Sequence, residues 1–260
     1  MEFYTLASGS EGNCSLVRAG GTLLLFDAGI SCRRIEQALR ALGLTLADVR
    51  AVFLTHAHSD HVSGLKTLSK KYGTPIYATC GTARALPVPA VTFSAGDTAD
   101  FAECTVRSFP TSHDAPDPVG YRVDSAGGSL GLLTDTGYVT DAAREALAGV
   151  DTLLLEANHD LELLRHGPYP YFLKQRILGD EGHLSNDAAA DFARYAARSG
   201  TRDILLAHLS RENNTPELAE YAVARALQSE GLSVRLSVAP RGTTSEVHIC
   251  RRSPSFASEN

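Results

Sequence analysis

The sequence has no apolar run approaching 18 residues and no basic leader before its first apolar segment. The first absence excludes a membrane-spanning helix, and the second gives no sign of an export signal. Its five cysteines form no Cys-x-x-Cys pair, and their odd number disfavours a disulfide framework. We therefore expect buried free thiols, a reducing compartment and a cytoplasmic protein with no membrane partner.

An excess of positive charge is also missing, as are linkers, low-complexity tracts and short-period repeats. The formal net charge of −6 does not suggest a general nucleic-acid binder. The content of 43% hydrophobic and 21% charged residues is typical of a soluble enzyme. We expect a single domain over residues 1–260, with a frayed tail at 252–260. The oligomeric state stays open, and a homo-oligomer is possible.

Four potential metal ligands lie within six residues, in the pattern His56-x-His58-x-Asp60-His61. They follow the apolar run 51–54, which predicts a buried strand. If the strand continues through the motif, His56, His58 and Asp60 share one face, and His61 begins a helix. Imidazole and carboxylate ligands suit two divalent cations held side by side. Such cations would make a cleft locally positive in an acidic protein.

Further reactive side chains follow strand-like runs along the chain. They are Asp27, His113, Asp135, Glu156 and His208. Position alone does not say which of the two aspartates ligates metal. Two strand-rich halves interleaved with helices predict an α/β fold, with two sheets face to face and helices outside.

The complete ligand pattern resembles that of the metallo-β-lactamase-fold hydrolases over nearly the whole chain. The resemblance implies a four-layer αββα sandwich with a dinuclear site along one edge of the sheets. It implies that Asp135 bridges two divalent metal ions, one held by His56, His58 and His113 and the other by Asp60, His61 and His208. A bridging aspartate, where the antibiotic-degrading members use cysteine, argues against β-lactam hydrolysis.

Four segments are more closely similar to the YycJ/WalJ branch of that family: 8–14, 156–160, 182–186 and 208–214. Members of this branch are associated with 5′-to-3′ exonuclease action on DNA and with mismatch repair. The resemblance implies a two-metal phosphodiesterase that acts on DNA through a metal-bridging hydroxide. The alternative is a dinuclear hydrolase of a small anionic substrate, such as a cyclic phosphodiester or a thioester. Histidine ligands favour zinc, while the oxygen ligands leave manganese open.

Three side chains are expected to carry the catalysis. Asp60 would ligate metal and orient the nucleophile or accept its proton. The resemblance extends to ribonuclease Z, in which a glutamate and a histidine assist the leaving group. Glu156 and His183 occupy comparable places, so His183 would donate the proton while Glu156 holds its tautomer. Helix capping is the alternative for both residues. Ser185 and Asn186 are expected to bind a substrate phosphate at a helix N-terminus.

For three further features, the sequence allows two interpretations. The segment 8–13 is either a hairpin turn or a loop at the rim of the metal site. His159 is either an auxiliary proton donor or a structural partner. The segment 166–176 either stacks its aromatic residues on bases, with Lys174 and Arg176 on phosphate, or packs as an ordinary helix start.

Overall fold

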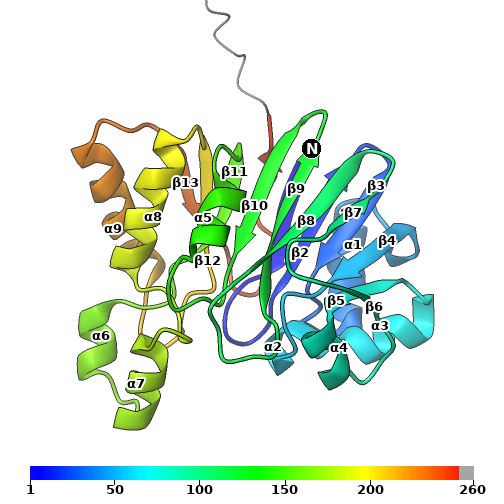
Figure 1. Cartoon of the computed structure of the whole chain (residues 1–260), viewed down its shortest axis with the longest axis horizontal. Helices are drawn as coiled ribbons and strands as arrows, with labels where there is room; N and C mark the ends of the chain where they lie inside the picture. The colour runs from blue at the N-terminus through cyan, green and yellow to red at the C-terminus, as the bar shows by residue number, and fades with distance from the viewer. Residues whose placement is uncertain (252–260) are drawn as a thin grey trace, which may run out of the picture.

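The computed structural model describes residues 1–251, so the predicted frayed tail at 252–260 lies outside the described residues. Two seven-stranded sheets pack face to face, with helices outside them (Figure 1). The strand orders are β14-β1-β2-β3-β4-β5-β6 and β13-β12-β11-β10-β9-β8-β7. This arrangement confirms the predicted αββα sandwich.

The first sheet contains β1 (Glu2–Ala7), β2 (Cys14–Ala19), β3 (Thr22–Phe26), β4 (Val49–Phe53), β5 (Ile76–Thr79), β6 (Val91–Phe93) and β14 (His248–Ile249). Strands β3 to β6 run parallel, and β2 pairs antiparallel with both β3 and β1. The helices that follow these strands are α1 (Cys32–Ala41), α2 (Ser59–Val62), α3 (Leu65–Tyr72) and α4 (Cys80–Ala85), with the 3-10 turn η1 (Leu46–Asp48). Apolar side chains of α1 and α3, such as Ile35 and Leu68, bury the outer face of this sheet.

The second sheet contains β7 (Thr98–Asp100), β8 (Cys104–Pro110), β9 (Val119–Ser125), β10 (Gly128–Leu133), β11 (Thr152–Glu156), β12 (Asp203–Ala207) and β13 (Arg235–Val238). Strands β10 to β13 run parallel, while β7 to β10 pair antiparallel. Its helices are α5 (Asp141–Leu147), α6 (Leu161–His166), α7 (Tyr171–Leu178), α8 (Asn186–Arg198) and α9 (Pro216–Ser229). Helix α8 begins after the N-cap Ser185, and α9 has Pro216 in its first turn, as capping and proline preferences favour.

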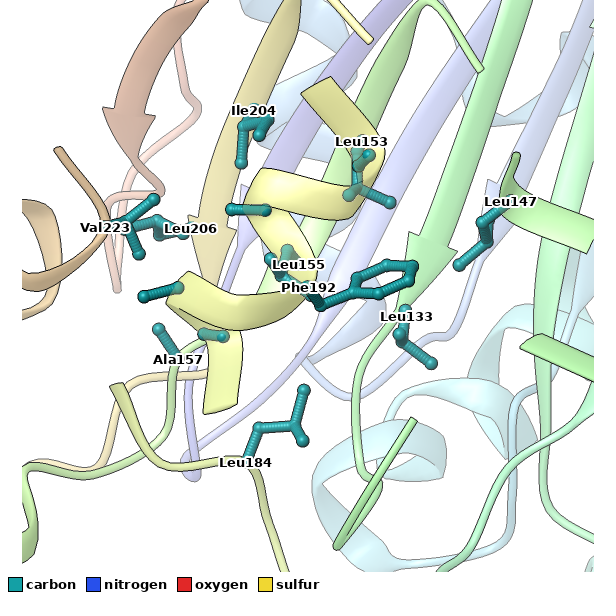
Figure 2. Close-up of a cluster of buried hydrophobic side chains, with 14 of the residues drawn as sticks. Leu133, Leu147, Leu153, Leu155, Ala157, Leu184, Phe192, Ile204, Leu206 and Val223 are labelled. Atoms are coloured by element: carbon teal, nitrogen blue, oxygen red, sulfur yellow. The ribbon is translucent and has the colours of Figure 1, made fainter. Parts of the chain in front are cut away.

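The hydrophobic core has an inner layer between the sheets and an outer layer beneath the helices. Between the sheets, the rings of Phe26, Phe53 and Tyr121 pack with centroids 5.2–5.6 Å apart. Outside the second sheet, Phe192 of α8 lies over Leu133 and Leu155 (Figure 2). A fully buried leucine or phenylalanine contributes roughly 1.5–3 kcal/mol, so these layers fix the strands whose ends carry the reactive residues.

Two details of the sequence-based prediction are wrong. Strand β4 ends at Phe53, and α2 already begins at Ser59, so Asp60 is helical rather than extended, while His61 is helical as predicted. In a helical turn, successive side chains such as those of Asp60 and His61 point in different directions around the helix axis, whereas in an extended strand alternate side chains line one face. Cys80 is exposed, while the other four cysteines are buried and all five are free thiols. Over residues 1–251, no helix is long and apolar enough to cross a membrane.

Candidate metal centre

Three histidines converge at the edge where the strands end. His56, His58 and His113 offer ligand atoms within 4.8 Å of one another. His58 Nδ1 lies 3.0 Å from His56 Nε2 and 3.3 Å from His113 Nε2. Two nitrogens bound tetrahedrally to one zinc at 2.0–2.1 Å would lie about 3.4 Å apart. Because a single proton cannot satisfy three facing lone pairs, this set fits a cation better than a hydrogen-bond network.

A second set, Asp60, His61 and His208, lies beside the first. Asp60 Oδ2 is 3.4 Å from His61 Nε2 and 3.6 Å from His208 Nε2. Asp135 stands between the sets, 3.4 Å from His61, 3.5 Å from His208 and 3.8 Å from His113. Asp135 Oδ2 and His208 Nε2 are buried without a hydrogen-bond partner. Such orphaned atoms are costly unless a bound group satisfies them, so these residues fit two cations sharing Asp135.

The strand exits carry unusual backbone conformations. Asp27, Asp135 and His208 have φ angles of 60°, 57° and 55°, a left-handed region that costs a non-glycine residue about 1–3 kcal/mol. At Gly29, an added Cβ would lie 1.6 Å from the carbonyl oxygen of Asp60. Only glycine therefore lets the end of β3 approach the histidine motif this closely.

The structure distinguishes the two aspartates that the sequence left equivalent. Asp27 does not line the cavity at the metal centre, whereas Asp135 does. Asp27 Oδ2 lies 2.8 Å from His61 Nδ1, and its Oδ1 accepts the backbone N–H of Thr55 at 2.9 Å. The Thr55 hydroxyl is also 3.0 Å from His56 Nδ1. Asp27 and Thr55 thus orient the imidazoles of the candidate ligands His61 and His56 through their Nδ1 atoms, which sequence reasoning missed.

The loop 8–13 lies at the rim of the metal centre. Ser10 lines the cavity, and the Ser8 hydroxyl accepts the backbone N–H of His208 at 2.9 Å. Asn13 Nδ2 lies 3.3 Å from Asp60 Oδ2 and 3.1 Å from His61 Nε2. The loop therefore holds ligands of the second set in place.

Glu156 connects the predicted proton donor to a ligand. It is fully buried, and its Oε1 lies 2.8 Å from His183 Nδ1 and 2.9 Å from His208 Nδ1. Its Oε2 accepts the backbone N–H groups of Thr136 and Leu184, both at 3.1 Å. A carboxylate only accepts, so both Nδ1 atoms carry protons, and the Nε2 atom of His208 is the ring nitrogen left to face the metal centre. The sequence did not predict the contact with His208.

The pKa shifts follow from burial and this dense packing of charge. Burial disfavours the imidazolium of His208, but Asp135, Asp60 and Glu156 outweigh it and raise its pKa to about 10. Burial likewise opposes the charged form of Glu156, yet His183 and His208 lower its pKa to about 2. Burial lowers the pKa of His56 well below its usual range. A cation at the second set must therefore displace a proton, which makes its binding pH-dependent.

Three further residues lie around the centre without lining its cavity. The Ser185 hydroxyl caps α8 by accepting the Ala188 N–H at 3.2 Å. Asn186 is buried and exchanges hydrogen bonds with Asn214 at 3.0 and 2.8 Å. Their contact with a substrate phosphate stays a prediction. His159 is buried with neither ring nitrogen hydrogen-bonded, and burial lowers its pKa to about 4, so it packs as a neutral side chain.

The cavity over the two ligand sets measures about 250 Å³. Its floor carries candidate ligands, including His58, Asp60 and His208, while one wall comes from the segment around α7. Asp114 connects the floor of the cavity to this wall, because its Oδ1 lies 3.5 Å from His113 Nε2 and its Oδ2 accepts a hydrogen bond from Arg176 Nε at 2.5 Å. Sequence reasoning missed Asp114, although it directly follows a predicted ligand.

Comparison with known proteins shows the relationships of the chain. The family model for the β-lactamase superfamily domain matches residues 22–209. The chain is 40% identical over 242 residues to exodeoxyribonuclease YycJ of Bacillus anthracis, covering 90% of this chain and 92% of that protein. It is 39% identical over 243 residues to exodeoxyribonuclease WalJ of Streptococcus pneumoniae, covering 90% of each.

Two more distant proteins are similar to the chain in sequence or in fold. Ribonuclease Z of Mycobacterium bovis is 30% identical over 197 residues, covering 59% of this chain and 69% of that protein. The metallo-β-lactamase-fold protein YhfI of Bacillus subtilis superposes with a TM-score of 0.70 at 17% identity, covering 94% of this chain and 98% of that one. The latter match shows likeness of fold.

Proposed function

Because this chain belongs to the metallo-β-lactamase superfamily, we propose that it is a two-metal phosphodiesterase that removes nucleotides from the 5′ end of DNA. The observation that carries the proposal is the Glu156–His183 pair beside two complete ligand sets, in a chain 40% identical to a named exodeoxyribonuclease. A role in DNA mismatch repair and a cytoplasmic location rest on the family resemblance and the free cysteines, and belong to the same proposal.

The close grouping of nitrogen and carboxylate donor atoms supports an assignment of metal ligands. His56, His58 and His113 would hold one cation, Asp60, His61 and His208 the other, and Asp135 would contact both. When bound, two such cations supply a water activated near neutral pH and neutralise charge on a phosphodiester. Zinc and manganese are the two candidates, because the set mixes imidazole with carboxylate.

The charge of the centre favours an anionic substrate. The five imidazoles of the two sets are neutral as ligands, whereas Asp60 and Asp135 each contribute one negative charge. Two divalent cations would therefore leave a net charge of about +2 in a buried centre. A phosphodiester, with one negative charge and two non-bridging oxygens, complements this field.

His183 is the proposed general acid. Its Nδ1 is held by Glu156, so a protonated His183 donates from Nε2 to the departing alkoxide in the cavity that it lines. Glu156 fixes the ring orientation and stabilises the imidazolium. Asp60, at the edge of the second set, would orient the attacking water. A thioester would not require this pair, since a thiolate leaves without protonation.

The test is digestion of 5′-labelled and 3′-labelled linear DNA by metal-reconstituted protein, with Zn²⁺ and Mn²⁺ compared and Asp60→Ala as the control. We expect progressive release of nucleotides from the 5′ end, which the control lacks. Intact DNA together with rapid hydrolysis of bis-p-nitrophenyl phosphate would overturn the DNA assignment and favour a small anionic substrate.

A further inference from the structure

Helix α7 exposes apolar side chains that have no partner among the described residues. Five of its eight residues, in the sequence YFLKQRIL, are apolar, yet none is buried. Tyr171 and Phe172 are 76% and 73% exposed, more than any other large apolar side chain in residues 1–251. In Figure 1, α6 and α7 (light green, lower left) stand away from the sheets. An exposed apolar patch of this kind marks an interaction site.

The opposite face of the same helix belongs to the metal cavity. Tyr169, Leu173 and Ile177 line that cavity together with the metal-binding side chains. Arg176 is tied to Asp114, which lies beside His113 of the first ligand set. The segment that carries the exposed patch therefore also forms one wall of the cavity in which the scissile phosphate would bind.

Charge decides which part of a nucleic acid this surface fits. The segment 161–182 has three basic residues and three acidic residues, so it is neutral. All three cations already have partners: Lys174 donates to the Arg165 carbonyl at 2.8 Å, Arg176 bonds to Asp114, and Arg165 bonds to Glu162 at 3.2 Å. A neutral surface offers little to the phosphate backbone. Exposed aromatic rings offer a stacking face to any base that is not paired.

We propose that Tyr171 and Phe172 form a stacking platform for unpaired nucleotides of the DNA strand whose terminal phosphodiester enters the metal cavity. The inference rests on the proposed function and narrows its substrate to ends with a single-stranded 5′ region. A base in a blunt duplex is stacked and paired, so it cannot lie against these rings until the end frays. Leu173, which follows Phe172 in the same helix, forms the apolar wall of the cavity together with Tyr169 and Ile177.

The test compares the double variant Tyr171→Ala/Phe172→Ala with wild type and with Tyr221→Ala. Tyr221 is 63% exposed on α9 and does not line the cavity, so it controls for loss of any exposed aromatic ring. Substrates are a 5′ overhang, a blunt duplex and bis-p-nitrophenyl phosphate. For the overhang, we expect KM of the double variant to rise roughly 5- to 100-fold, the loss of about one stacked base. Metal content and hydrolysis of the small ester should change less than twofold.

A second readout separates stacking from charge. The dependence of log KM on log salt concentration should keep its slope in the double variant, because no phosphate contact is removed. The exchange variant Tyr171→Phe/Phe172→Tyr keeps both aromatic faces and should retain the wild-type KM for the overhang.

Several results would overturn the proposal. They are an unchanged KM on the overhang, an equal rise for Tyr221→Ala, and loss of activity on all three substrates, which would make the rings structural. A shift from dimer to monomer in light scattering would assign the patch to a second copy of the chain. If wild type hydrolyses the small ester and leaves DNA intact, the proposed function fails. If the double variant digests the overhang as well as wild type does, only the stacking inference fails.

Discussion

Replacing Glu156 by glutamine isolates the residue that connects catalysis with metal binding. Four N–H groups point at its carboxylate, namely the Nδ1 atoms of His183 and His208 and the backbone amides of Thr136 and Leu184. An amide of the same shape has one acceptor oxygen and one NH₂ donor. Because the backbone amides cannot stop donating, we expect the oxygen to face them and the NH₂ group to face the two imidazoles.

The imidazoles must then change tautomer to avoid two facing donors. Each Nδ1 becomes an acceptor, and the ring proton moves to Nε2. At His208 that proton occupies the atom proposed to bind metal, so we expect affinity at the second set to fall about 10- to 100-fold, the usual effect of losing an outer hydrogen-bond partner. At His183 the stabilised imidazolium is lost, which should reduce kcat by about 10²–10⁴ at saturating metal.

Two measurements separate these effects. Metal titration with a competing chelator gives the affinity of each site, and turnover of bis-p-nitrophenyl phosphate at saturating metal gives the catalytic loss. The double variant Glu156→Gln/His183→Ala should be little slower than either single variant at saturating metal, because both changes remove the same proton donation. Wild-type metal affinity and a kcat within threefold of wild type would refute the assignment of Glu156.

Three other predictions concern single residues. His183→Ala should keep both metal equivalents while kcat falls about 10²–10⁴; loss of a metal in elemental analysis would instead make His183 a ligand. Asp135→Ala should empty at least one site, and an unchanged metal content would remove Asp135 from the ligands. In chelator-treated protein, the pKa of His208 near 10, against 6.5 ordinarily, contributes stability that is complete below pH 6.5 and is lost as the pH rises through 10. Urea titrations over that range should show a steeper loss of unfolding free energy than in metal-loaded protein, and parallel profiles would contradict this reasoning.

Much of the fold was predictable from local patterns. Ser31 before an amphipathic run and Pro216 at a first helical turn give the starts of α1 and α9 correctly, because capping and proline preferences act over a few residues. The extension of β4 to Asp60 was wrong for a related reason. Alternation of side chains favours a strand, but convergence on a common centre requires the turn of α2, and that requirement comes from distant strands.

In the candidate site, too, local sequence predicted some features and only the fold revealed the others. The histidine motif is visible because its members are neighbours in sequence. The separate roles of Asp27 and Asp135 are not, because both end apolar strands and differ only in what faces them across the sandwich. Likewise, the contact of Glu156 with His208 joins β11 to the end of β12, a pairing set by the parallel sheet and not by spacing.

The strain at the strand exits follows from how the sandwich is built. Parallel strands deliver Asp135 and His208 to one edge, but an extended residue there would continue along its strand, away from the neighbouring sheet. A left-handed turn at each exit redirects the side chain across the edge, at a cost of about 1–3 kcal/mol per residue. The buried layers beneath Phe192 and between the sheets hold these turns before any cation binds. Aspartate and histidine are both among the non-glycine residues enriched in this conformation, so local preference and the geometry of the site favour the same residues at these two exits.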